Sequence, residues 1–264
     1  MTRDGSVALI VEGPVAEIVL NAPKKLNALD EDMLADLTRA LDEAEAAGVR
    51  ALLLRGEGRA FCAGRDISAV DPADDDAFGY LNDLVTPLLH RLAAFPAPTF
   101  AIAHGACLGV GLGLLIAADV VYVAETARIG SPFANLGAAL DCGGHALFFE
   151  RLGAHRTLDL IYTNELMSGA EAVAAGLFSR VVPDEEILSF TRERARRVAA
   201  GATEAFLASK RLVSALRDER IGLWQAVDGE NRTQADLSRT ADYAEGFRAF
   251  REKRRPSFDG GRPA

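Results

Sequence analysis

The sequence predicts an α/β fold, because segments of strand type alternate with segments of helical type through the first half of the chain. Twice, a short apolar strand runs directly into a glycine-rich loop, first before Gly64 and again before Gly105. From Cys142 onward the pattern is mainly helical. We therefore expect an α/β core and a helical part that packs on this core or on a neighbouring molecule.

The first elements follow from local patterns. Apolar runs at residues 7–11 and 16–20, joined by Glu12-Gly13-Pro14, predict a β-hairpin. Asp30 predicts the N-cap of a helix that stops at Gly48. This helix would bury one face, which consists of Leu34, Leu37, Leu41 and Ala44. The run 49–54 predicts the next strand, which leads into the first glycine loop.

The order of helix, strand and glycine loop is then repeated. The acidic residues 71–76 predict a solvated loop that could also border a substrate tail, and residues 77–94 predict a helix. Residues 99–103 predict a strand before the second glycine loop, 110–118 a buried helix and 120–124 another strand. Further on, Ser168 and Glu171 form a capping-box pattern, and residues 184–198 are amphipathic.

Composition excludes some classes of function. The net charge of −9 argues against nucleic-acid partners and anionic membrane surfaces, although a small anionic ligand needs only a few local cations. Cys62, Cys107 and Cys142 have spacings that fit neither a disulfide framework nor a metal site, so we expect reduced thiols and no metal. The N-terminus lacks a signal-peptide pattern, so we expect a cytoplasmic protein.

The two glycine loops indicate anion binding through backbone amides. Gly64 lets the chain turn sharply after a buried strand and leaves the next N–H available to a ligand. The loop from Gly105 to Gly113 opens a helix, so its free N–H groups and the helix dipole favour an anion. Leu114 stands where a dinucleotide fingerprint requires Gly or Ala, and no Gly-Lys-Ser/Thr is present for a P-loop.

Three motifs together resemble the crotonase superfamily, the enoyl-CoA hydratase/isomerase family. They are Phe61-Cys62-Ala63-Gly64-Arg65-Asp66-Ile67, His104 to Gly113 with Ala118-Asp119, and Ala244-Glu245-Gly246-Phe247-Arg248-Ala249-Phe250. The resemblance covers nearly the whole chain. It implies a spiral of ββα units in residues 1–195, a C-terminal helical trimerisation region in 196–264, and a homotrimer or dimer of trimers. It also implies acyl-CoA substrates and no cofactor other than the coenzyme A of the substrate.

The resemblance also implies site residues. The amides of Arg65 and Val110 would form the oxyanion hole, whereas the Arg65 side chain need not take part. Coenzyme A and the acyl group would be bound by Lys24, Leu26, Ala63, Gly64, Asp66, Ile67, Gly109, Pro132, Phe133, Leu136, Phe250 and Lys253. Of these, Phe250 and Lys253 would come from an adjacent subunit. The alternative for Lys24 and Lys253 is that they are solvated surface cations.

The choice of reaction depends on three positions. Family hydratases use two glutamates, but this chain has Gly113 and Phe133 at the matching positions. Isomerases of the family carry their base at a third position, which here is Asp141. We therefore predict an enzyme that converts 3-enoyl-CoA to 2-enoyl-CoA by proton transfer through an enolate.

Alternatives remain open from the sequence. Asp141 could instead cap the following helix, and burial and a helix N-terminus would shift its pKa in opposite directions. The reaction could be hydration, thioester hydrolysis or dehalogenation, and the chain could also bind acyl-CoA without turnover. The four histidines, His90, His104, His145 and His155, are interpreted as structural.

Overall fold

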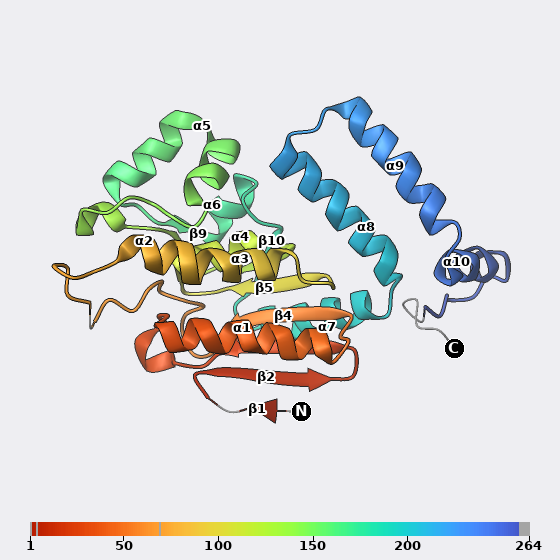
Figure 1. Cartoon of the computed structure of the whole chain (residues 1–264), viewed down its shortest axis with the longest axis horizontal. Helices are drawn as coiled ribbons and strands as arrows, with labels where there is room; N and C mark the ends of the chain where they lie inside the picture. Colours follow the sequence, from red (N-terminus) through yellow and green to blue (C-terminus); the bar gives the residue numbers. More distant parts are fainter. Residues whose placement is uncertain (1, 4, 69, 259–264) are drawn as a thin grey trace.

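The computed structural model describes residues 2, 3, 5–68 and 70–258 and has the predicted α/β architecture (Figure 1). Its main sheet has seven strands in the order β1-β2-β3-β4-β5-β7-β10, and a second sheet has the order β6-β8-β9. The strands are β1 (Thr2–Arg3), β2 (Val7–Glu12), β3 (Val15–Leu20), β4 (Ala51–Gly56), β5 (Thr99–Ala103), β6 (Ala106–Leu108), β7 (Val120–Ala124), β8 (Arg128–Gly130), β9 (Met167–Ser168) and β10 (Arg180–Val182).

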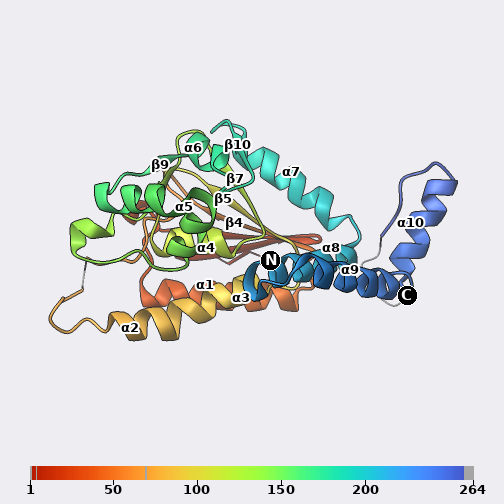
Figure 2. The ribbon, with the colours of Figure 1, turned by 90° about the horizontal axis from the view of Figure 1, so that it is seen from above.

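Helices cover both faces of the main sheet and then leave it. They are η1 (Pro23–Lys25), α1 (Glu31–Ala46), α2 (Ala77–Gly79), η2 (Tyr80–Val85), α3 (Thr86–Ala93), α4 (Val110–Ala117), η3 (Phe133–Leu136), α5 (Gly144–Thr163), α6 (Gly169–Ala174), α7 (Ile187–Ala199), α8 (Thr203–Ser214), η4 (Ala215–Glu219), α9 (Leu223–Leu237) and α10 (Ala241–Arg251). Helices α2 and α10 lie toward opposite ends of the molecule (Figure 2).

The first strands and the first long helix form as their local sequence patterns predict. Strands β2 and β3 form an antiparallel hairpin in which Val7 pairs with Leu20. The Asp30 carboxylate accepts a hydrogen bond from the Met33 amide at 2.9 Å and so caps α1. The predicted apolar face of α1 is buried. Helix α6 likewise begins with the predicted capping box of Ser168 and Glu171.

The central strands are buried on both faces, and alternate residues enter two different cores. Leu52 and Leu54 of β4 pack in the core that contains α1, whereas Leu53 packs in the core that contains α7. This follows from the two-residue period of a strand. It also explains why the strand segments are continuous apolar runs in the sequence.

Parallel pairing places the site loops together. Strands β3, β4, β5, β7 and β10 run parallel to one another, so their carboxyl ends lie at one edge of the sheet. The chain after β4 and the chain after β5 both contain a glycine loop. The two loops therefore leave the sheet at the same edge.

The C-terminal helices extend away from the sheet. Helices α8, α9 and α10 project to one side of the core in both ribbon views (Figures 1 and 2). The predicted boundary between residues 195 and 196 lies within α7, and the division of the chain there stays a prediction. Within the described part of the chain, no helix is both long and apolar enough to cross a membrane.

Candidate active site

The two glycine loops lie side by side. The Cys62 amide donates to the Ala106 carbonyl at 3.0 Å, and the Leu108 amide donates to the Cys62 carbonyl at 3.0 Å. Gly64 has a φ of +100°, and a Cβ atom there would lie 3.1 Å from the Leu108 carbonyl oxygen. Glycine is therefore needed at position 64, both for its backbone conformation and for the close approach of the second loop.

The Arg65 amide is left available by its neighbours. Leu29 donates from its amide to the Gly64 carbonyl at 2.8 Å, and its carbonyl accepts from the Asp66 amide at 2.9 Å. Because peptide groups alternate in direction along an extended chain, the N–H of Arg65 points away from Leu29. It has no acceptor among the residues that the structure describes.

The Val110 amide is the second available donor. Val110 is the first residue of α4, and the first amides of a helix have no acceptor within the helix. The preceding Gly109 has a φ of +53°, and its own amide donates to the Ser131 hydroxyl oxygen at 3.0 Å. Two unpaired N–H groups from adjacent loops, one of them at a helix N-terminus, can bind an oxyanion.

Phe133 packs directly on the second loop. A Cβ atom at Gly109 would lie 2.7 Å from Cζ of Phe133, so the ring covers this glycine. Pro132 and Phe133 are half-buried, whereas Leu136, at the end of η3, is exposed. Phe133 therefore places an apolar ring against the second glycine loop, at the position where the resemblance implies an acid in hydratases.

The predicted coenzyme A segment lies next to the first loop. The Ala63 amide donates to the Leu26 carbonyl at 3.0 Å, and Lys25, not Lys24, pairs with Asp66 at 2.6 Å. Hydrogen bonds from Lys25 and Ser68 hold the pKa of Asp66 below its usual range. Asp66 is therefore a fixed ionised partner of Lys25, while Lys24 and Ile67 are exposed.

Asn27 was not identified from the sequence, although it joins these segments. Its buried side-chain amide donates to the carbonyls of Glu57, Ala60 and Phe61, and its Oδ1 accepts from the Ala22 amide. It has a φ of +56°, a conformation that asparagine tolerates. Its position in a Leu-Asn-Ala run gave no local signal, because all of its partners except Ala22 lie about thirty residues away.

Asp141 lies beside the first turn of α4. A Cβ atom at Gly113 would lie only 2.5 Å from Cβ of Cys142, the next residue after Asp141. Helix α5 has Gly143 as its N-cap and no side-chain cap, so the Asp141 side chain does not cap it. Its Oδ1 atom is buried and has no hydrogen-bond partner among the described residues.

The environment of Asp141 suits a base. Burial raises the pKa of its carboxyl, and a hydrogen-bonding interaction with the Cys142 thiol and the charge of His145 oppose this in part. A carboxylate with a raised pKa is a stronger base than an ordinary one. Cys142, the neighbour of the candidate base, is half-buried and packs against the core, whereas Cys62 and Cys107 are fully buried.

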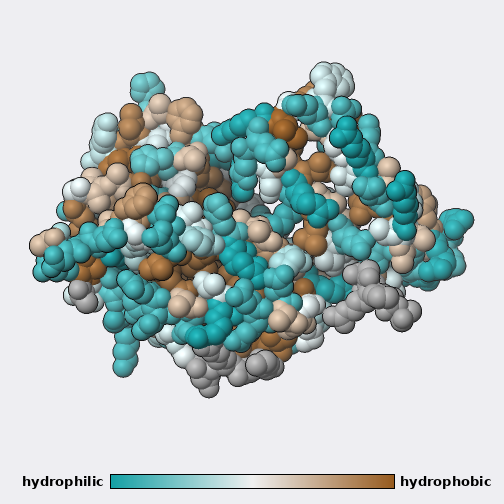
Figure 3. Space-filling view, viewed as in Figure 1, coloured by the Kyte–Doolittle hydropathy of each residue, from teal (hydrophilic) through white to brown (hydrophobic). Residues whose placement is uncertain are grey.

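A large cavity begins next to this residue pair. It has a volume of about 1710 Å³ and is lined by residues of α3, α4, α5 and α8, including Gly113, Cys142 and Gly143. The surface is hollowed between α5 and α8 (Figure 3). The cavity therefore opens beside Cys142, the residue after Asp141, whereas Asp141, Arg65 and Val110 are not among the residues that line it.

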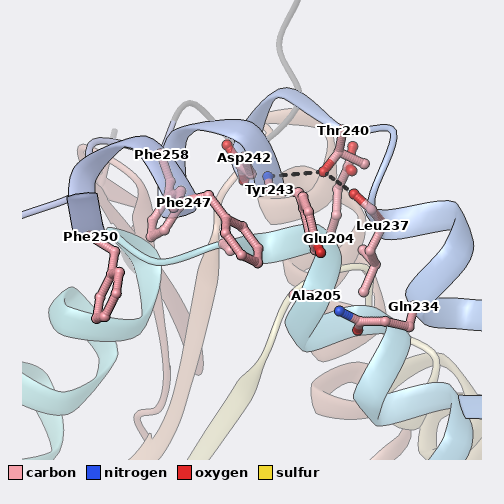
Figure 4. Close-up of a pocket in the computed structure, with 12 residues that line it drawn as sticks. Glu204, Ala205, Gln234, Leu237, Thr240, Asp242, Tyr243, Phe247, Phe250 and Phe258 are labelled. Atoms are coloured by element: carbon pink, nitrogen blue, oxygen red, sulfur yellow. Dashed lines mark hydrogen bonds between the residues drawn. The ribbon is translucent and has the colours of Figure 1, made fainter. Parts of the chain in front are cut away.

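Phe250 and Lys253 lie far from the glycine loops of their own chain. Phe250 is in the last turn of α10 and Lys253 follows the helix, which is remote from α4 in both ribbon views (Figures 1 and 2). Phe250 is 83% exposed. It lies at one end of a pocket of about 490 Å³ between α8, α9 and α10, with Phe247 and Phe258 beside it (Figure 4).

The third sequence motif has a structural role within the chain. The Glu245 carboxylate accepts from Arg254 at 2.6 Å, from Arg248 at 2.6 Å and from the Ser257 amide at 2.9 Å. These contacts hold the pKa of Glu245 below its usual range, with Arg254 as the main cause. These hydrogen bonds to Glu245 fix the position of the chain after α10.

Among the described residues, no group of three or more His, Cys, Asp or Glu is arranged to hold a metal ion.

Comparison with known proteins identifies the family. Residues 11–261 match the family described as Enoyl-CoA hydratase/isomerase. A Rhodobacter capsulatus relative named "Probable enoyl-CoA hydratase" is 35% identical over 251 residues, covering 95% of this chain and 96% of the relative. The 1,2-epoxyphenylacetyl-CoA isomerase of Escherichia coli is 32% identical over 255 residues, covering 95% of this chain and 97% of that protein.

Solved structures agree with this result. An enoyl-CoA hydratase from Bacillus anthracis has a TM-score of 0.87 and 27% identity, covering 97% of this chain and all of that one. The chain therefore has the crotonase fold that its motifs predict, and it belongs to the enoyl-CoA hydratase/isomerase family, whose members act on acyl-CoA thioesters.

Proposed function

We propose that this enzyme is an enoyl-CoA isomerase that moves a double bond from C3 to C2 of an acyl-CoA, with Asp141 as its base. The observation that carries the proposal is the half-buried Asp141 carboxylate, whose Oδ1 atom has no partner among the described residues and whose neighbour Cys142 packs against Gly113 of α4. Asp66 and Asp75 are less suitable bases, because Lys25 and Arg65 hold them as ion pairs.

Each group has a defined task in this reaction. The Asp141 carboxylate removes a proton from C2, and the electron pair moves onto the thioester oxygen to give a dienolate. The amides of Arg65 and Val110 donate hydrogen bonds to that oxygen, which stabilises the negative charge. Protonated Asp141 then returns the proton to C4, the double bond becomes conjugated with the thioester, and the carboxylate is regenerated.

Hydration is less well supported by the side chains, although hydratase names predominate among the relatives. Neither Gly113 nor Phe133 can position or deprotonate water. Position 113 has no space for an acid, since Cys142 occupies the place of its side chain. The Escherichia coli relative is named as an isomerase of an acyl-CoA, which supports isomerisation rather than water addition in a chain of this kind.

The decisive variant is Asp141→Asn, assayed with a panel of 3-enoyl-CoA substrates. We expect kcat to fall by about 10²- to 10⁴-fold, the range for a lost general base, while binding of a 2-enoyl-CoA product is retained. Asp74→Asn is the matched control, because its carboxylate lies on an exposed loop.

Retention of isomerase activity in Asp141→Asn would exclude this role of Asp141. Mass spectrometry of the products distinguishes the other functions. Water addition, release of free coenzyme A, halide release from a halogenated acyl-CoA, or tight binding without turnover in the wild-type protein would each replace isomerisation as the function.

We also propose that the chain forms a homotrimer or a dimer of trimers in which α10 completes a neighbouring site. The projecting helices α8, α9 and α10 support this, because the pocket between them is lined by Tyr243 and by the exposed rings of Phe247 and Phe250. One wall of this pocket holds Asp242, whose buried Oδ2 atom has no partner within the described chain. Phe250 and Lys253 can reach a glycine loop only if that loop belongs to another copy.

A further inference from the structure

The Arg65 side chain is held on two sides. Its guanidinium donates to both carboxylate oxygens of Asp75, at 3.0 and 2.7 Å, and lies 4.0 Å from the centroid of the Tyr80 ring. A bidentate pair fixes the orientation of the guanidinium as well as its position, and the aromatic face attracts the cation. Both side chains of the pair are only 22–23% exposed.

Asp75 and Tyr80 belong to one local unit. Asp76 accepts a hydrogen bond from the Gly79 amide at 2.8 Å and caps the helical segment that begins at Ala77. This cap fixes the acidic loop to the start of η2. The Asp75 carboxylate and the Tyr80 ring, which lie on either side of this cap, therefore contact the Arg65 guanidinium from one short segment.

Tyr80 connects this unit to the backbone around Arg65. Its buried hydroxyl donates to the Leu29 carbonyl at 3.4 Å, the same carbonyl that accepts from the Asp66 amide. The Leu29 amide in turn holds the Gly64 carbonyl. Burial raises the pKa of the Tyr80 hydroxyl, so it stays a donor at neutral pH.

We propose that the Arg65 side chain is a positioning residue, clamped by Asp75 and Tyr80 so that the Arg65 amide points at the substrate oxyanion. This inference rests on the oxyanion role proposed above and adds a side chain that this role does not require by itself. Gly64 has no side chain to restrain its neighbour, so the direction of the next amide depends on external contacts. The acidic loop thereby gains a function other than solvation.

The test compares Asp75→Asn, which breaks the pair, with Asp75→Glu, which keeps a carboxylate. Polarisation of a bound thioester is measured from the ¹³C shift of [1-¹³C]2-butenoyl-CoA, and kcat and KM are measured for isomerisation. We expect Asp75→Asn to move the carbonyl signal toward its value in free solution. We also expect it to lower kcat by about 3- to 10-fold, the effect of losing a partly exposed, bidentate ion pair.

The variants separate positioning from general stabilisation. Asp75→Glu is expected to retain most of the wild-type carbonyl shift and kcat. In an Arg65→Ala background, Asp75→Asn is expected to have no further effect, because the interaction is already lost. Asp74→Asn, a change of equal charge on the same loop, is the control and should leave both readouts unchanged.

Two outcomes would overturn the clamp. One is a wild-type carbonyl shift in Asp75→Asn, and the other is a wild-type protein that binds the probe without polarising it, which would also remove the oxyanion role. If the wild-type protein polarises the thioester and Asp75→Asn does not, but no 3-enoyl-CoA is isomerised, the clamp is retained and the isomerase proposal fails.

Discussion

At the scale of single residues, two aspartates near the glycine loops differ in their surroundings and therefore in their chemistry. Asp66 accepts from Lys25 and Ser68, and its pKa is lowered. Asp141 is half-buried, its Oδ1 atom has no partner among the described residues, and burial raises its pKa. Both residues were candidates from the sequence, but only the contacts in the fold distinguish an ionised structural partner from a base.

This difference predicts how stability depends on pH. The folded-state pKa of Asp141 lies above the value of about 3.9 for an unfolded aspartate, so its protonated form stabilises the fold below that value and this contribution is lost as pH rises through the raised pKa. Asp141→Asn does not titrate. We therefore expect the free energy of unfolding of Asp141→Asn, relative to that of the wild type, to increase as the pH rises through this window.

Denaturant unfolding at a series of pH values, with Asp74→Asn as the control, measures this difference. A constant difference between Asp141→Asn and the wild type across the window would contradict the raised pKa. In the same window, kcat/KM of the wild type should rise with pH, because the base must be ionised.

At the scale of elements, local patterns were sufficient where one segment supplies all the contacts. The hairpin, the Asp30 cap and the capping box at Ser168 each depend on residues within a few positions, and all are confirmed. The small sheet of β6, β8 and β9 was not predicted, since its three strands are very short and pair only across loops. The contact between α4 and the start of α5 was also not predicted.

The close contact between α4 and Cys142 predicts that a glycine-to-alanine substitution destabilises the protein in α4 but not in α9. Gly113→Ala in α4 should lower the free energy of unfolding by about 1–3 kcal/mol, because the new Cβ overlaps Cys142 in a packed interior. Gly229→Ala in α9 is the control. Its Cβ would lie 3.1 Å from the flexible end of Leu212, so we expect a change between zero and a gain of about 1 kcal/mol.

Thermal or urea unfolding of the two variants checks this prediction. Equal effects at positions 113 and 229 would show that Gly113 has space for a side chain. In that case, steric exclusion of a glutamate would no longer support isomerisation over hydration.

At the scale of the whole molecule, the proposal that α10 completes a neighbouring site depends on where the groups lie within one chain. The glycine loops flank α4 in the core, whereas Phe250 lies on α10 and Lys253 follows that helix, which projects from the core (Figure 1). A C-terminal arm with an exposed aromatic surface is expected to pack on another copy.

Subunit complementation tests this arrangement. Asp141→Asn and the double variant Phe250→Asp/Lys253→Glu should each be poorly active alone. If α10 serves a neighbouring site, co-assembly in equal amounts should restore about one site in four, those that combine a wild-type core with a wild-type α10. Light scattering reports the number of subunits in the same samples, and mixing that restores no activity would place both groups in one chain.

The sequence by itself determined the strand and helix order, the glycine positions and the family motifs, because these depend on local backbone preferences and on residue identity. The tertiary structure decided which groups are free to react. Lys25 rather than Lys24 pairs with Asp66, Cys142 fills the space at Gly113, and Asp75 and Tyr80 hold Arg65. Such pairings join residues distant in sequence, and their geometry and burial set the charges and directions that chemistry requires.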